Sequence, residues 1–186
     1  MTRRSGPRKV TPPYLRNAAL HYLDRYASSS ANLRRLLLVK VERSARAHGT
    51  DRRDGAAVVE ALLAEFQRSG LLDDARYAEA RSRAWHRRGA SARAIRNRLT
   101  SQGVATEHIA RALDLLREAT ADPDLAAALA FARRRRLGPY RARAARAAHR
   151  ARDLAALGRQ GFAYALARRV IEADDPADLE AEATAD

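Results

Sequence analysis

Length, composition and charge already exclude several classes of protein. The chain has 186 residues, 46% of them hydrophobic, which is enough for one compact domain or for two or three small helical modules. It contains no Cys, which excludes disulfide frameworks, thiol nucleophiles and Cys-ligated zinc. No run reaches the roughly 18–20 consecutive apolar residues of a membrane span, and no apolar signal-peptide core follows the basic N-terminus. We therefore expect a cytoplasmic protein without membrane contact.

The positive charge exceeds what solubility requires. The chain carries 36 Lys and Arg against 22 Asp and Glu, a formal net charge of +14, and its pI is near 11.3. Such a charge predicts a polyanionic partner, for example nucleic acid or a nucleoprotein filament. Apart from Lys9 and Lys40, all of these cations are Arg, which suits bidentate phosphate contacts and stacking on bases. A GC-rich genome can explain the preference for Arg over Lys, but it cannot explain the net charge.

A basic arm and a first helix open the chain. Residues 1–10 contain Gly6 and Pro7, lack periodicity and are predicted to form a flexible basic arm. Thr11 and Pro12 are typical of an N-cap and a first helical position. Apolar residues then follow at helical spacing and predict one buried stripe. The members of that stripe are Leu15, Ala18, Ala19, Tyr22, Leu23 and Tyr26.

Two more helices complete a first set, and the same order of caps and stops then recurs. The serines at 28–30 restart the chain with a helix that ends at His48 and Gly49, and another helix runs from about Asp54 to Gly70. The caps predicted for the next set are Asp73 or Asp74, Ser91 and Thr106, and Asp122 opens a third set.

One helix ending supports a tandem repeat. Leu99-x-x-x-Gly103-Val104 matches Leu157-x-x-x-Gly161-Phe162, with Ala45-x-x-x-Gly49 as a weaker copy. The steps between the glycines are 54 and 58 residues, the spacing expected of stacked three-helix units. No alternation of β-branched residues predicts a strand.

The expected fold class is therefore all-α, as an elongated tandem array of three three-helix repeats with helix-turn-helix-like modules. The boundaries are 1–10 for the basic arm, 11–72 for repeat 1, 73–121 for repeat 2, 122–172 for repeat 3 and 173–186 for an acidic tail.

No pattern of catalytic residues is visible. The five His residues lie far apart, without metal-ligand spacing, and neither a P-loop nor a G-x-S-x-G elbow occurs. Asp73 and Asp74 could form a paired carboxylate, but their position before a helix favours N-capping. We expect no enzyme activity, no metal and no cofactor.

Positive charge is concentrated in two stretches without any acidic residue, 80–106 and 125–152. Like charges repel along a helix, so such runs indicate a partner that neutralises them. The predicted binding residues are Arg76, Arg81, Arg83, Arg87, Arg88, Arg93, Arg96, Arg98, Arg133, Arg134, Arg135, Arg136, Arg150 and Arg152. The alternative is a solvated face whose Arg stems cover Ala-rich surfaces. Trp85 could stack on a base, but its place in an apolar stripe favours core packing.

The central motifs resemble those of the RecX family of bacterial RecA regulators. Residues 70–78 read GLLDDARYA, the most recognisable block, and Ile95, Leu99 and Gly103 follow in the family's order. Residues 19–28 resemble its opening helix, and GFAY at 161–164 its closing repeat. The likeness covers about residues 14–171. The chain departs from the family in having Arg-rich rather than Lys-rich helices, and in Ala165 after the closing motif.

The resemblance implies a curved array of three repeats in the helical groove of a RecA–DNA filament. There it would limit filament growth and lower RecA's ATP hydrolysis, strand exchange and co-protease activity, with roles in homologous recombination, DNA repair and the SOS response. We expect a monomer whose partners are the RecA filament and, more weakly and with salt sensitivity, single-stranded DNA. The alternatives are a general nucleic-acid-binding protein without a recombinase target and a nuclease, although no carboxylate or His cluster supports the latter.

The C-terminal acidic tail suggests an internal competitor of DNA. Seven carboxylates lie between Glu172 and Asp186 without a cation, which predicts a disordered or weakly helical segment. Tethered close to Arg133–Arg136 and Arg150–Arg152, they would compete with DNA phosphates for those side chains. A purely solubilising tail is the alternative.

Overall fold

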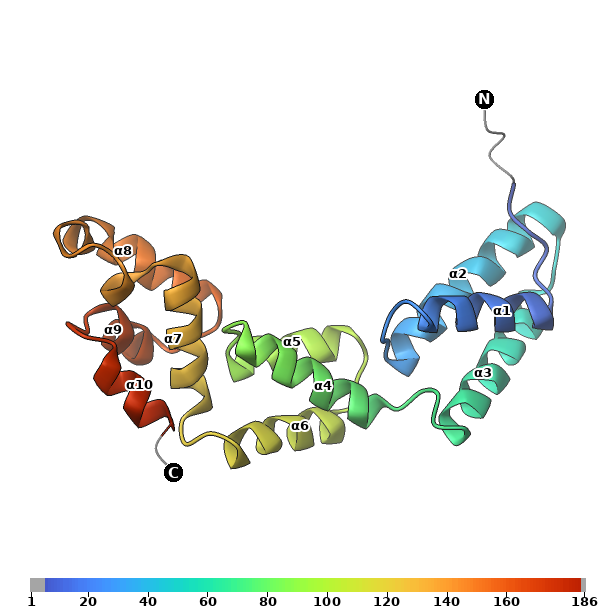
Figure 1. Cartoon of the computed structure of the whole chain (residues 1–186). Helices are drawn as coiled ribbons and strands as arrows, with labels where there is room; N and C mark the ends of the chain where they lie inside the picture. The colour runs from blue at the N-terminus through green and yellow to red at the C-terminus, as the bar shows by residue number, and fades with distance from the viewer. Residues whose placement is uncertain (1–5, 185–186) are drawn as a thin grey trace. The chain divides into compact units, whose positions relative to one another are not determined.

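The computed structural model describes residues 6–184, and over that range the chain forms ten α-helices, one 3-10 helix and no strand (Figure 1). This confirms the predicted all-α class. The helices are α1 (Pro12–Leu23), α2 (Ser30–His48), α3 (Arg52–Arg68), α4 (Asp74–Arg87), α5 (Ala92–Ser101), α6 (Thr106–Glu118), α7 (Pro123–Arg135), η1 (Gly138–Tyr140), α8 (Arg143–Arg159), α9 (Tyr164–Ile171) and α10 (Ala177–Thr184). Among the described residues, no helix combines the length and apolar character needed to cross a bilayer.

The helices belong to two compact units. The first unit extends to Tyr77 and includes Gln102–Val104, and the second contains Ala78–Ser101 and the chain from Ala105 onward. Helices α1–α3, α4–α6 and α7–α9 fall within the three predicted repeat ranges, but the unit boundary lies inside α4. The repeat boundaries therefore stay a prediction.

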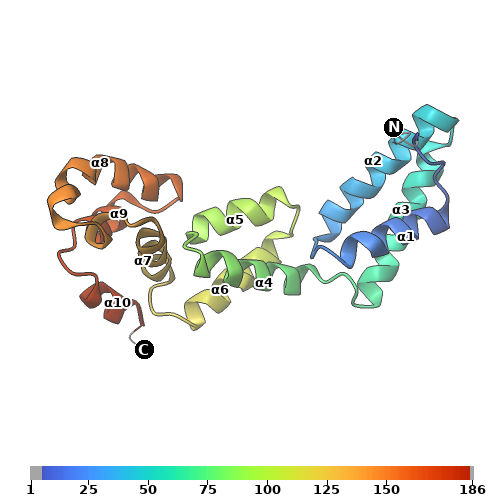
Figure 2. The ribbon, with the colours of Figure 1, turned by 45° about the horizontal axis from the view of Figure 1, so that its top comes forward.

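In the first unit, α1 and α3 lie against α2 (Figure 2). Leu15, Leu33 and Val59, one from each helix, have no exposed surface and anchor a shared core. The predicted stripe of the first helix extends too far, because α1 ends at Leu23. Tyr26 follows that end and is 57% exposed, so its place in the stripe was wrong.

Most predicted helix starts are confirmed by side-chain hydrogen bonds. Thr11 caps α1 and Asp122 caps α7, each through its side-chain oxygen. Asp73 accepts the Arg76 N–H at 2.9 Å and so caps α4, as predicted for one of the two neighbouring aspartates. The prediction for Thr106 was wrong, because the N-cap of α6 is Ala105.

The repeated helix ending has a packing reason as well as a conformational one. Gly103 and Gly161 have φ of 72° and 88°, which disfavours side chains. A Cβ atom would also lie 2.4 Å from the Ala31 Cβ at Gly103, and 2.8 Å from the Ser91 Oγ at Gly161. A Cβ atom at Gly49, the glycine of the weaker copy, would meet no other atom within 4 Å, so this residue serves only as the C-cap of α2.

In the second unit, α7 is the most buried helix, and α8, α9, η1 and α10 pack around it or one another (Figure 2). Leu125, Leu157 and Val170 from α7, α8 and α9 have no exposed surface. A buried ion pair fixes η1, since Asp153 accepts the Gly138 N–H at 3.0 Å and bonds to Arg141 at 3.0 Å. The acid-free stretch thus includes a structural Arg whose partner lies just beyond it.

Residues after Ile171 are more ordered than predicted. Residues 177–184 form α10, Ala183 is 1% exposed within the core, and Leu179 packs against it. The Tyr140 hydroxyl donates to Glu180 at 2.6 Å. Of the two alternatives predicted for the tail, disorder was therefore wrong for residues 177–184, which are helical. Asp186 lies outside the described residues.

Candidate nucleic-acid and filament interface

The predicted Arg residues lie on four helices and their ends. They occupy α4 and the position after it, α5, the C-terminal turn of α7 with its cap Arg136, and α8. Arg76 belongs to the first unit and the other thirteen belong to the second. All are exposed except Arg81, which is half-buried. Nearly all of these side chains are therefore accessible to a partner.

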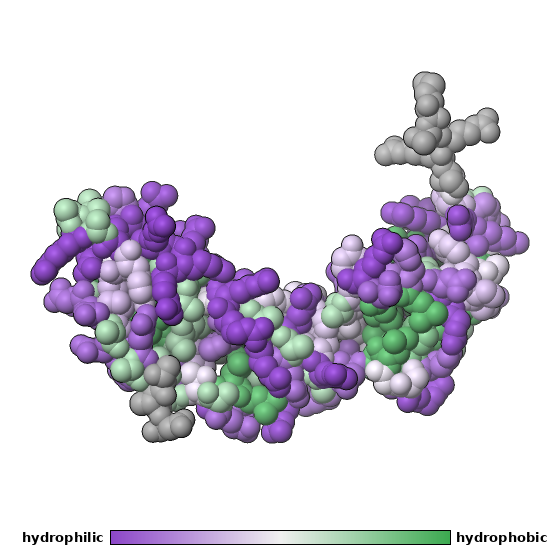
Figure 3. All heavy atoms as spheres, in the orientation of Figure 1, coloured by the Kyte–Doolittle hydropathy of each residue, from purple (hydrophilic) through white to green (hydrophobic). Residues whose placement is uncertain are grey.

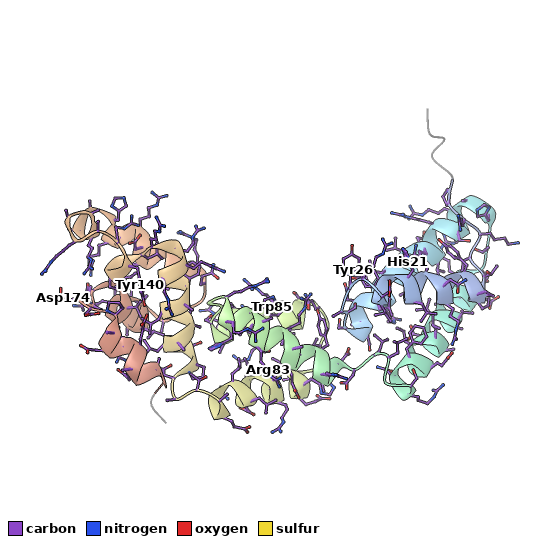
Figure 4. All side chains as sticks on the ribbon, in the orientation of Figure 1. His21, Tyr26, Arg83, Trp85, Tyr140 and Asp174 are labelled. Carbon is purple, nitrogen blue, oxygen red and sulfur yellow. The ribbon has the colours of Figure 1, made fainter. Side chains whose placement is uncertain are left out.

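Trp85 lies among these residues, but it is not an open stacking platform. Its ring is half-buried, and the guanidinium groups of Arg81 on α4 and Arg98 on α5 lie 5.7 and 5.4 Å from its centroid. These are cation–π distances. Arg81 and Arg98 thus hold α4 to α5 through Trp85. Figure 4 shows Trp85 and Arg83 on different faces of α4.

Acidic side chains already neutralise three of the predicted residues. Arg83 pairs with Glu79 one turn earlier at 3.0 Å, Arg133 lies 3.8 Å from Glu180, and Arg150 binds Glu172. A fourth residue, Arg134, covers the Phe131 ring at 5.8 Å. These four groups must give up a partner or leave an aromatic ring before they bind another anion.

Glu172 binds two Arg side chains at once, Arg150 and Arg168. The pKa of Glu172 is lowered, first by the hydrogen bond from Arg168 and then by that from Arg150. The same contact raises the pKa of Arg150. The Glu172 carboxylate therefore stays ionised between two cations and keeps them partly neutralised.

Eight predicted residues are exposed and form no ion pair or cation–π contact within residues 6–184. They are Arg76, Arg87, Arg88, Arg93, Arg96, Arg135, Arg136 and Arg152. Arg93 and Arg96 are three residues apart and share one face of α5. Hydrophilic residues spread over α5, α7 and α8 on the visible face of the molecule (Figure 3). Among the predicted binding residues, these eight are the ones available for phosphate or carboxylate groups.

Sequence reasoning did not separate binding from structural Arg residues. Arg146 lies in the same acid-free stretch, yet it donates to the main-chain carbonyls of Pro139, Arg141 and Asp174. Arg168 and Arg169 were not predicted, and they pair with Glu172 and Glu182. The spacing of four residues in Arg168–Glu172, as in Glu79–Arg83, was a local signal of such a pair.

In the described part of the chain, no three His, Asp or Glu side chains converge in a way that could hold a metal ion. Ring nitrogens of His48, His86 and His149 instead lie 2.6–3.0 Å from main-chain carbonyl oxygens.

Comparison with known proteins gives consistent matches. The family model described as RecX, second three-helix domain, matches residues 73–113. The regulatory protein RecX of Myxococcus xanthus strain DK1622 is 43% identical over 169 residues, which are 90% of this chain and 89% of that protein. The regulatory protein RecX of Agrobacterium fabrum strain C58 is 34% identical over 163 residues, 85% of this chain and 82% of that protein. No solved structure matches the chain.

Proposed function

Because the chain belongs to the RecX family, we propose that it is a regulatory protein that binds the RecA–DNA filament. It acts mainly as an inhibitor of RecA's ATPase, strand-exchange and co-protease activities. It does so by binding rather than by catalysis, and it contacts single-stranded DNA more weakly and with salt sensitivity.

The observation that carries this proposal is that eight exposed Arg side chains on or next to α4, α5, α7 and α8 form no ion pair within residues 6–184. Exposed guanidinium groups without an acidic partner favour a ligand with phosphate or carboxylate groups, and a RecA–DNA filament offers both. Guanidinium groups bind both anions bidentately, so they suit DNA and acidic protein surfaces equally.

The decisive experiment measures the rate at which RecA from the same source hydrolyses ATP on single-stranded DNA. The chain is added at concentrations too low to coat that DNA. We expect the rate to fall, because a filament regulator acts on many RecA subunits from few bound sites. The matched control is a different ATPase that depends on single-stranded DNA, measured on the same DNA.

An equal fall for both ATPases, seen only when the chain covers the DNA, would contradict the proposal. That result would favour a general nucleic-acid-binding protein without a recombinase target.

A further inference from the structure

The first unit contains a basic pocket that none of the predicted binding residues lines. It has a volume of about 570 Å³ and is lined by Gly6, Pro7, Arg8, Tyr14, Lys40 and Arg43. Its three charged lining residues are all cations, and no acidic residue lines it. The predicted binding residues all lie at position 76 or later in the sequence, so this pocket is a separate basic site.

The fold holds the pocket wall in place. The arm before α1 runs along the C-terminal half of α2 (Figure 1), where the Val10 N–H donates to the buried Ser44 Oγ at 2.8 Å. The His48 Nε2 lies 2.6 Å from the Pro7 carbonyl oxygen, which can only accept, so the ring donates. Arg8 sits between these two anchors. The expected flexible arm is thus fixed from Pro7 to Val10.

The three cations are not neutralised within the described residues. Lys40 lies 5.6 Å from the centroid of the Tyr14 ring, and neither Lys40, Arg43 nor Arg8 forms an ion pair there. The one acid on α2 is engaged elsewhere, since Glu42 bonds to Arg52 and Arg46. Those hydrogen bonds, from Arg52 first, lower the pKa of Glu42 to about 2. Glu42 therefore stays ionised and paired away from the pocket.

The chemistry of the lining favours a phosphate with an organic group attached. Lys supplies a compact point charge, and Arg supplies a planar fork that matches phosphate oxygens. The Tyr14 ring and Pro7 add apolar surface that suits a sugar or a base. The volume is also large for a bare phosphate ion.

We propose that this pocket binds a phosphodiester of single-stranded DNA. This deepens the proposed function, because it names a DNA contact in the first unit, but it requires no recombinase. Lys40 and Arg43 supply the charge from α2, and Arg8 closes the site from the arm.

The test measures binding of a fluorescent oligo-dT by the full chain over a series of chloride concentrations. Lys40→Gln combined with Arg43→Gln should weaken binding roughly tenfold and flatten the log–log salt slope by about 1.4, since each single-strand phosphate contact adds about 0.7. The matched control is Arg25→Gln with Arg68→Gln, two exposed residues of the same unit that lie outside the pocket and form no ion pair within the described residues. The control should change both quantities much less.

Two results would overturn the proposal. Equal losses in both double variants would mean that only net charge matters. No loss in the pocket variant would mean that DNA does not enter the pocket, and competition by inorganic phosphate at matched ionic strength would then identify free phosphate as the ligand. If circular dichroism shows that the double variant is unfolded, the comparison is repeated with two single variants outside the helices. Arg8→Gln then replaces the pocket variant, and Arg25→Gln is its control.

The assay separates this proposal from the proposed function. Suppose that the unaltered chain leaves RecA's ATPase rate unchanged while the pocket variant loses affinity for oligo-dT. That pair of results would contradict the proposed function and still support DNA binding in the pocket.

Discussion

The Ser91 hydroxyl donates a hydrogen bond of 2.7 Å to the main-chain carbonyl of Gln160, 69 residues further along the chain. The first unit contains the same contact, since the Ser29 hydroxyl donates to the Gln102 carbonyl at 2.6 Å. Each serine also caps its own helix. The next N–H in each case, that of Ser30 or Ala92, donates to a carboxylate of Asp74 or Asp124 at 2.8 Å. The two units thus each contain the same set of contacts, which we call a serine junction.

Replacing a junction serine removes a cap and a long-range hydrogen bond together. Ser91→Ala and Ser29→Ala should each lower the free energy of unfolding by about 2 kcal/mol, measured by urea denaturation. Ser101→Ala is the control, because within residues 6–184 its exposed hydroxyl bonds only to the Arg98 carbonyl. It should change stability by less than about 0.5 kcal/mol. Equal effects at all three positions would contradict the role of the junction.

Ser82 and Ser44 should respond in opposite directions to the same substitution. Both have no exposed surface, but the Ser82 Oγ is the one buried side-chain oxygen without a hydrogen bond among the described residues. Ser44 accepts from Val10 and from Thr50. Ser82→Ala should raise the unfolding free energy by about 1 kcal/mol, whereas Ser44→Ala should lower it by about 1–3 kcal/mol. A loss of stability in Ser82→Ala would reveal a missing partner.

The ion pairs Arg141–Asp153 and Arg117–Asp114 differ mainly in burial. The Asp153 side chain is 2% exposed and that of Asp114 is 51% exposed. Asp153→Ala leaves Arg141 and the Gly138 N–H without their acceptor and should cost about 3 kcal/mol in thermal or urea unfolding. Asp114→Ala should cost less than about 1 kcal/mol. Similar costs for the two would show that η1 does not depend on the buried carboxylate.

Exposed Arg residues should contribute to binding far more than to stability. Arg83, Arg87, Arg93 and Arg96 are all exposed, and their combined replacement by Ala should weaken DNA and filament binding while the melting temperature stays nearly constant. The unaltered chain should lose roughly a thousandfold in DNA affinity between 50 and 200 mM salt if about six phosphates are contacted. A salt-independent affinity, or unfolding of the fourfold variant, would instead support a packing role.

The acidic helix α10 offers a test of internal competition with DNA. Glu180 and Glu182 contact Arg133 and Arg169, so Glu180→Gln with Glu182→Gln should tighten DNA binding about fivefold at low salt. The gain should shrink at physiological ionic strength. Deleting 173–186 would also remove the buried Ala183, so the neutral variant is the cleaner test.

Its control is Asp174→Asn with Asp178→Asn, which makes the same charge change at exposed carboxylates without an ion pair in residues 6–184. Equal tightening in the control would show that net charge, rather than the α10 contacts, sets the affinity.

The sequence by itself determined the features that depend on neighbours a few positions away. Thr11, Asp73 and Asp122 cap helices as predicted because a cap bonds to a backbone N–H two or three residues later. The glycines of the repeated ending were found by spacing alone, although their close packing against Ala31 and Ser91 was not. Local rules failed at Thr106, where the chain enters α6 one residue earlier.

Only the tertiary structure decided which charges are available. Arg150 and Glu172 are 22 residues apart in the sequence, and Arg141 and Asp153 are 12 apart. No local sequence pattern predicts either pair. The acidic C-terminal composition predicted a disordered or weakly helical segment, but it gave no sign that Ala183 and Leu179 pack in the core or that Tyr140 bonds to Glu180 and so orders α10. Coulomb interaction and burial depend on distance through space, which remote segments set as they pack. Composition therefore predicted a polyanion-binding chain, while the fold determines which Arg side chains remain free to bind.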